Sequence, residues 1–132
     1  MSTNYIDTFI TVSADCKAKA GTVPPKAGTI GALQLSLLLE RPYGLTSEEL
    51  LLEVHMIRNG IPPADREAAR ESLFAKPQAC LRTSPLVKSY GWGLHHDGTG
   101  RVAAHAVESG AYRDLSTRPD LTVVAGMRNG RG

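Results

Sequence analysis

The segment around Cys80 carries residue types that can perform nucleophilic chemistry. Cys80 is followed by Arg82 and by a predicted helix start at Ser84. A nearby guanidinium and a helix N-terminus both favour the thiolate, which is the reactive form of cysteine. Such a nucleophile also needs a base within reach, and His95 and His55 are the candidates. The alternative is that Cys80 is a small apolar residue within a strand, since free cysteines are often buried.

The same segment also suits the binding of an anion. Arg82, Thr83 and Ser84 place a guanidinium and two hydroxyls just before the predicted helix start, where backbone N–H groups are unpaired and the helix dipole favours negative charge. Lys88 adds positive charge, and Trp92 follows shortly afterwards. These five residues predict a site for a phosphate or a carboxylate. The alternative is that Ser84 only caps the helix, while Arg82 is solvated or paired with an acid.

Three of the four histidines lie in a predicted β-hairpin. If Gly100 forms a bulge in its turn, His96 pairs near Arg101, and His105 lies on the same face as His96 but several residues away. His95 then points to the opposite face, because side chains alternate along a strand. A metal ion needs three or four ligands converging at about 2 Å, so this register predicts no metal site. The sequence also contains no recognised cofactor motif, so no cofactor is predicted.

Hydrophobic periodicity and turn residues predict the elements that position these residues, within one α+β domain spanning residues 1–132. Helices cluster in the N-terminal half, and a β-hairpin–helix–strand unit follows, which favours a mainly antiparallel sheet. A capping box at Thr46 and Glu49 favours a helix over 48–59, although a strand is the alternative there. The predicted elements are a strand at 5–12, helices at 29–40, 48–59 and 64–76, a strand at 79–83, a helical turn from Ser84, a hairpin at 92–96 and 101–107, a helix at 110–116 and a strand at 121–127.

Composition bounds the class of protein. Of the 132 residues, 42% are hydrophobic and 21% charged, as in an ordinary globular domain. The net charge of +2 and an aromatic content of 5% argue against nucleic-acid binding. The start of the chain has no signal-peptide pattern, and its longest apolar run is far shorter than the roughly 20 residues of a membrane span. Cys16 and Cys80 form no CxxC pair, so we expect a cytoplasmic protein with free thiols.

The chain resembles a family of small bacterial proteins classed only as a domain of unknown function. The resemblance rests on ELLLEVHMIRNGIP at 49–62, FAKPQACLRTSPL at 74–86 and YGWGLHHDGTGRVAAHAVES at 90–109, with ITVSADC and a Pro-Pro pair earlier in the chain. It spans nearly the whole chain and implies a free-standing protein of one domain. It carries no activity, substrate or catalytic residue, so it transfers none to this sequence.

Two classes of function remain open from the sequence. The first, which we favour, is a small ligand-binding or protein-interaction domain with an anion site near Arg82 and Ser84. A binding domain is preferred because no complete set of nucleophile, base and orienting group is visible. The alternative is a small enzyme that uses Cys80, or a histidine such as His95, as nucleophile or general base. The partners left open are a small anionic ligand, a protein or a second copy of the chain, without nucleic acid or membrane.

Overall fold

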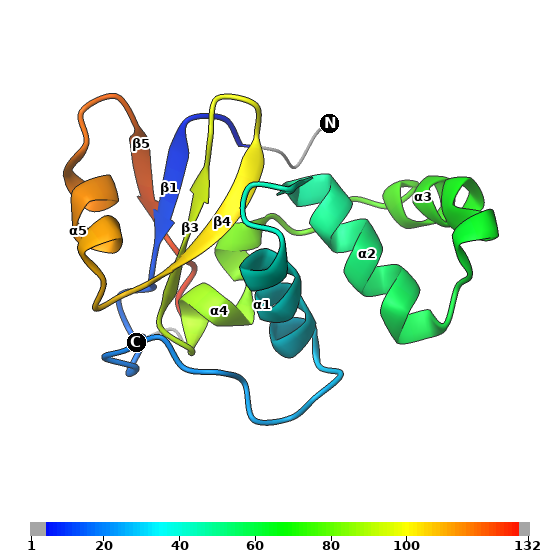
Figure 1. Cartoon of the computed structure of the whole chain (residues 1–132), viewed down its shortest axis with the longest axis horizontal. Helices are drawn as coiled ribbons and strands as arrows, with labels where there is room; N and C mark the ends of the chain where they lie inside the picture. Colours follow the sequence, from blue (N-terminus) through cyan, green and yellow to red (C-terminus); the bar gives the residue numbers. More distant parts are fainter. Residues whose placement is uncertain (1–4, 130–132) are drawn as a thin grey trace.

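The centre of the structure, a computed structural model that describes residues 5–129, is a five-stranded sheet (Figure 1). Its strands lie in the order β2-β4-β3-β1-β5. Neighbouring strands are antiparallel except for β1 and β5, which run parallel. The strands are β1 (Thr8–Thr11), β2 (Leu45–Thr46), β3 (Trp92–His96), β4 (Arg101–Ala106) and β5 (Thr122–Ala125).

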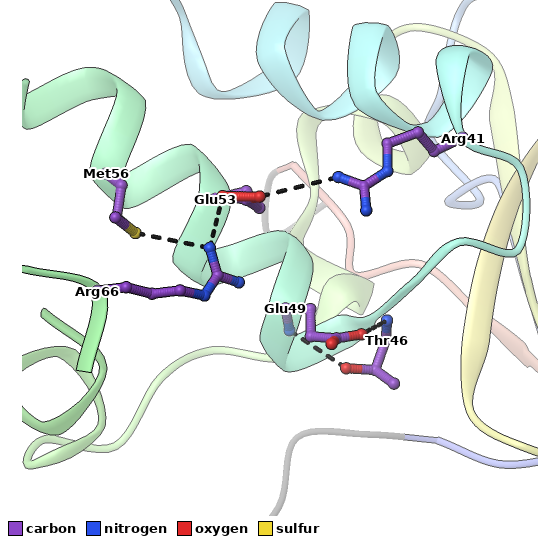
Figure 2. Close-up of polar contacts among 6 residues, drawn as sticks. All are labelled: Arg41, Thr46, Glu49, Glu53, Met56 and Arg66. Carbon is purple, nitrogen blue, oxygen red and sulfur yellow. Dashed lines mark hydrogen bonds and ion pairs between the residues drawn. The ribbon is translucent and has the colours of Figure 1, made fainter. Parts of the chain in front are cut away.

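The helices begin at side chains that cap them. Thr29, Thr46 and Ser109 each accept a hydrogen bond from a backbone N–H of the following first turn, which satisfies a donor that the helix itself leaves unpaired. At Thr46 the Glu49 carboxylate also accepts from the Thr46 N–H, 2.8 Å away, so the predicted capping box is present (Figure 2). The helices are α1 (Ile30–Glu40), α2 (Ser47–Asn59), α3 (Arg66–Phe74), α4 (Pro85–Lys88) and α5 (Gly110–Thr117), with 3-10 turns at Pro63–Asp65 and Leu81–Thr83.

Helices cover both faces of the sheet, with α5 on one side and α1 and α4 on the other (Figure 1). The main core lies on the α1–α4 side. On the α5 side, Phe9 of β1 packs edge-on against Tyr112, with ring centroids 5.0 Å apart. Because side chains alternate along a strand, successive residues of β3 face different layers. The main core is formed by Ile10, Leu35, Leu38, Leu45, Leu50, Val54, Leu81, Leu86, Val87, Leu94 and Val102.

Helices α2 and α3 form an arm beside the sheet (Figure 1). The arm has its own apolar cluster, which consists of Leu52, Met56 and Ala69. Glu53 of α2 pairs with Arg41, 3.8 Å away just after α1, and with Arg66, 3.1 Å away on α3 (Figure 2). Ion pairs this exposed contribute less than about 1 kcal/mol each, so they add little to the stability of the arm.

The predicted α+β class is confirmed, with early helices, a mainly antiparallel sheet and a C-terminal hairpin–helix–strand unit. The segment 48–59 is the helix α2, and the strand alternative is wrong. The strand predicted over 79–83 is also wrong, because the chain forms a 3-10 turn at Leu81–Thr83. The N–H and the hydroxyl of Thr83 both donate to the carbonyl of Cys80, at 3.1 and 2.8 Å. A threonine hydroxyl that bonds nearby backbone in this way favours a turn over a strand.

Candidate functional site

The register of the hairpin formed by β3 and β4 decides which histidines meet. Gly93 pairs with His105, and His95 pairs with Ala103. Paired residues share a face of the sheet, and successive residues alternate between faces. His95 and His105 therefore lie on the α5 side, while His96 points into the opposite layer. The expectation that His105 shares a face with His96 is wrong.

The error has a simple cause in the turn. Asp97 belongs to the paired part of the hairpin, since its N–H donates to the carbonyl of Arg101 at 2.9 Å. The predicted bulge at Gly100 is present: its φ is 82°, and its N–H donates to the carbonyl of Asp97 at 3.0 Å. The loop is therefore one residue shorter than expected. Because side chains repeat every two residues, a slip of one residue moves His105 to the other face.

Tyr43 joins the two histidines. Its hydroxyl lies 2.8 Å from Nδ1 of His95 and 3.0 Å from Nε2 of His105. Tyr43 comes from the turn between α1 and β2, where its N–H donates to the carbonyl of Val102 at 3.0 Å. Its φ of 55° lies in the left-handed region, which is unusual for a bulky residue. Backbone strain of this kind concentrates at functional sites, so the turn makes the cluster a candidate site.

The two hydrogen bonds of the Tyr43 hydroxyl, to His95 and to His105, form a bridge that restricts where the protons can be. A phenol donates one proton, so only one of two neutral imidazoles can accept from Tyr43, and the other donates to the phenol oxygen. In one arrangement His95 donates through Nδ1 and has a free lone pair on Nε2. In the other, Tyr43 donates to His95, and Nε2 carries the proton. Within residues 5–129, Nε2 of His95 has no hydrogen-bond partner and is reached by solvent.

Burial sets the charge state of the cluster. His95 is 8% exposed, and loss of solvation lowers its pKa below the usual 6.5, with a further lowering by the charge of Arg118. The pKa of His105 is also lowered, first by burial and then by His95. Burial raises the pKa of Tyr43 above 10.0, and the negative charge of Asp97 adds to this effect. At neutral pH the cluster therefore consists of two neutral imidazoles and a protonated phenol.

Charged side chains surround the cluster. One arginine and three aspartates influence the charge of His95, namely Arg118, Asp7, Asp97 and Asp120. Arg118 and Asp120 form an ion pair, which partly neutralises the arginine. The Asp97 carboxylate accepts hydrogen bonds within its own turn, from Thr99 and from the N–H of Arg101. With one positive and three negative groups, the surroundings favour a neutral or cationic ligand.

Cys80 does not join this cluster. Its sulfur accepts a hydrogen bond from the Tyr5 hydroxyl at 3.1 Å. The Tyr5 ring in turn packs edge-on against His96, with centroids 5.3 Å apart. Burial, together with the hydrogen bond to Cys80, raises the pKa of Tyr5 to about 12. Cys80 thus belongs to the layer of His96, and the sheet separates it from His95. The structure does not bring together the predicted pair of Cys80 and His95.

His96 lies in the core. Its side chain is fully buried, and Nε2 is 3.0 Å from the Ser47 hydroxyl at the start of α2. Among the described residues Nδ1 has no hydrogen-bond partner. Burial lowers the pKa of His96 to about 4, so the ring is neutral at physiological pH. A ring without solvent contact cannot meet a ligand, and we therefore assign His96 a structural role.

Two of the predicted anion-binding hydroxyls have partners inside the protein. Ser84 is 3% exposed. It caps α4 by accepting from the N–H of Leu86, 3.2 Å away, and its hydroxyl donates to Oε1 of Gln34 at 2.6 Å. The Thr83 hydroxyl donates to the carbonyl of Cys80, within the 3-10 turn.

The remaining predicted ligand-binding residues face different parts of the molecule. Arg82 donates through Nε to the carbonyl of Ala125, 2.7 Å away at the end of β5. Trp92 donates through its indole N–H to the carbonyl of Thr22, 2.8 Å away in the long loop before α1. Lys88 is half-buried at the end of α4. The structure therefore does not gather these side chains with the buried Ser84 hydroxyl around one site.

Sequence reasoning missed Tyr43. The run Pro42-Tyr43-Gly44 indicates a turn, but nothing in it points to histidines 52 and 62 residues further along the chain. The bridge depends on the left-handed backbone at Tyr43 and on the hairpin register, neither of which has a reliable sequence signal. Knowing the register would have placed the two histidines together, though not the phenol between them.

Other features of the described chain bear on the classes of chemistry. Within residues 5–129, no group of three or more histidine, cysteine, aspartate or glutamate side chains is arranged to hold a metal ion. Cys16 and Cys80 are both free. Over the same range, none of the helices combines the length and the apolar character required to cross a bilayer.

Comparison with known proteins identifies the family. A model described as a family of unknown function, DUF6157, matches residues 1–132, so the chain belongs to this family. The match covers the whole sequence and confirms the resemblance found in its three long segments. No curated protein and no solved structure matches the chain. The geometry of the side chains is therefore the basis for a functional proposal.

Proposed function

We propose that this member of the DUF6157 family is a small enzyme that takes a proton from its substrate, with His95 as the general base. Tyr43 and His105 are positioning residues, which orient the His95 ring and share its proton. The observation that carries the proposal is the Tyr43 hydroxyl, 2.8 Å from one imidazole and 3.0 Å from the other. No cofactor is needed for this chemistry.

The orientation of His95 supports the role of base. A histidine that abstracts a proton needs one nitrogen fixed by a hydrogen bond and the other free to meet the substrate. Nδ1 of His95 lies at hydrogen-bond distance from Tyr43, and Nε2 has no partner among the described residues and is not sealed from solvent. His95 also lies on a central strand, between β4 and β1, where the backbone is held on both sides. Such a ring loses little freedom when a substrate binds.

The bridge also provides a route for the proton. In the base form, Nδ1–H of His95 donates to Tyr43, which donates to Nε2 of His105. When Nε2 of His95 takes a proton, its Nδ1 proton passes to the phenol oxygen, and the phenol proton passes to His105. The positive charge then rests on His105, and when Nε2 of His95 gives its proton to the product or to water, the two transfers reverse and restore the base form. The phenol keeps one proton throughout, which agrees with its raised pKa.

The lowered pKa of His95 makes the base available. A general base acts in its neutral form, and it works best when its pKa lies near the operating pH. Because burial and Arg118 lower the pKa of His95 below 6.5, most molecules carry the neutral ring at pH 7. The three nearby carboxylates oppose this shift and favour a neutral or cationic substrate over an anion.

A binding domain with an anion site near Arg82 and Ser84 is the function less supported by the geometry. Ser84 is 3% exposed and its hydroxyl is engaged by Gln34. Cys80 is less suited than His95 to start a reaction, since its neighbour Tyr5 has a pKa of about 12 and donates a proton to the sulfur without taking one. Neither arrangement provides a fixed base.

An activated ester can test the proposal without knowledge of the natural substrate. An accessible neutral imidazole hydrolyses p-nitrophenyl acetate, so release of p-nitrophenolate reports on such a ring. We expect the rate to rise with pH and to level off by neutral pH, because the pKa of His95 lies below 6.5. His95→Gln should remove most of the rate, whereas His55→Gln, at a half-buried histidine of α2 outside the cluster, should keep it.

Tyr43→Phe tests whether the proton passes along the bridge, as proposed, or whether His95 acts alone. Without the hydroxyl, the His95 ring loses its anchor, and we expect a fall in rate of about tenfold with an altered pH profile. Tyr90→Phe is the matched control, since its ring packs against the core away from both histidines. Equal rates for the wild type and for folded His95→Gln would refute the role of His95. An unchanged rate and profile in Tyr43→Phe would refute the relay.

A further inference from the structure

A pocket lies between α1, α2 and α3, across the sheet from the histidine cluster. Its volume is about 170 Å³, and it is open to solvent. Its walls include the apolar side chains Ile30, Leu51, Val54 and Leu73. An apolar cavity of roughly 150 Å³ in another protein holds benzene, so this pocket has room for about six carbon atoms. An apolar wall of this extent suits the hydrocarbon part of a small ligand.

Gln34 of α1 brings an unpaired polar group to this pocket. Its side chain is 3% exposed and lines the pocket. The amide direction follows from Ser84, whose hydroxyl oxygen accepts from the N–H of Leu86 and whose proton therefore points to Oε1 of Gln34. Within residues 5–129, the Nε2 amide group has no hydrogen-bond partner. The Nε2 group is not sealed from solvent, so a ligand oxygen in the pocket can replace water as its acceptor.

Arg58 adds a positive charge to the same lining. It lies in the last turn of α2 and is exposed. Among the described residues it has no ion-pair partner. A guanidinium presents a planar fork of N–H donors that matches a carboxylate in geometry. The pocket thus combines an apolar wall, an amide donor that faces the pocket and an unpaired cation.

We propose that this pocket binds a small monocarboxylic acid with a branched apolar tail. The carboxylate accepts hydrogen bonds from the Gln34 amide and the Arg58 guanidinium, and the tail lies against the apolar wall. Both donors line the same pocket, as a single carboxylate that binds both requires. Ser84, which was predicted to hold an anion directly, contributes by fixing the direction of the Gln34 amide. The proposal is independent of the role of His95.

A titration with 4-methylpentanoate tests this site, with the Gln34 side-chain NH2 signal followed by NMR. We expect saturable shifts of that signal and of backbone signals along the pocket, with a dissociation constant on the order of 1 mM for a ligand of this size. Two controls separate the parts of the ligand: 4-methylpentanamide has the tail without the charge, and acetate has the charge without the tail. Each should bind at least about tenfold more weakly.

Two variants identify the donors. Arg58→Gln should weaken 4-methylpentanoate about tenfold, because a charge-assisted hydrogen bond is lost. Arg113→Gln, on the exposed surface of α5, is the matched control and should leave affinity unchanged. Gln34→Met keeps most of the side-chain volume while removing the amide, and it should also weaken binding. If Gln34→Met fails to fold, Arg58→Gln and the amide ligand still decide the matter.

Three results would overturn the proposal. The first is the absence of saturable shifts with 4-methylpentanoate up to about 20 mM, well above the expected dissociation constant. The second is equal binding of the acid and of 4-methylpentanamide, which would leave no role for the charge of Arg58. The third is shifts that map to the face of α5 and are unchanged in Arg58→Gln, because they would place the ligand elsewhere.

Discussion

Acid should destabilise the fold in part because His96 is buried in its neutral form. The ring is fully buried, and its pKa falls from 6.5 to about 4 on folding. Between these two pH values the unfolded chain binds a proton that the folded chain excludes. The stabilisation is therefore complete above about pH 6.5 and is lost as the pH falls towards 4. At roughly 1.4 kcal/mol per pKa unit, the loss is about 3 kcal/mol, a large part of the typical stability of a domain.

Urea unfolding at a series of pH values from 7.5 to 4.5 measures this loss. Carboxylates also titrate in this range, so the comparison that isolates the ring is with His96→Gln. Glutamine retains a polar atom towards Ser47 but takes up no proton. We expect the wild type to lose about 2.5 kcal/mol more than His96→Gln over this interval, because part of the full loss falls below pH 4.5. Parallel stability curves for the two proteins would refute the claim that the fold keeps His96 neutral.

Two further predictions concern stability at neutral pH, measured by urea unfolding. Tyr43→Phe removes the partner of two ring nitrogens and should cost about 1–2 kcal/mol, against little change for Tyr90→Phe; equal stabilities would show that the bridge is not formed. Gly91→Ala should cost at least about 3 kcal/mol, because φ is 80° and a Cβ would lie 2.4 Å from the carbonyl oxygen of Ala20. Gly60→Ala, with φ of 62° and open space around its Cβ, should cost only about 1 kcal/mol, and a similar cost for both would contradict the close approach.

Local signals in the sequence predicted most of the elements. Thr29, Thr46 and Ser109 cap the helices that periodicity indicated, because capping depends on residues only a few positions apart. Gly100 was predicted in the hairpin turn for the same reason, since few other residues tolerate its backbone angles. The segment 79–83 failed because a short run of apolar and β-compatible residues does not distinguish a strand from a turn.

The candidate site depends on longer-range geometry, and the sequence predicted only part of it. His95 was named as a base, but its expected partner Cys80 lies in the other layer of the sheet, beside Tyr5. Its actual partners are His105, which a register slip of one residue had hidden, and Tyr43, which comes from a strained turn. Register and left-handed backbone at a bulky residue are set by the whole fold, so local patterns do not reveal them.

The most direct test of the proposed site is an NMR titration of the histidine ring nitrogens in the wild type and in Tyr43→Phe. If the phenol links two neutral rings, His95 and His105 titrate below pH 6.5, each shows a defined tautomer, and the tautomer of His95 changes when the hydroxyl is removed. A His95 ring that titrates near 6.5, with the same tautomer mixture in both proteins, would contradict the shared-proton site.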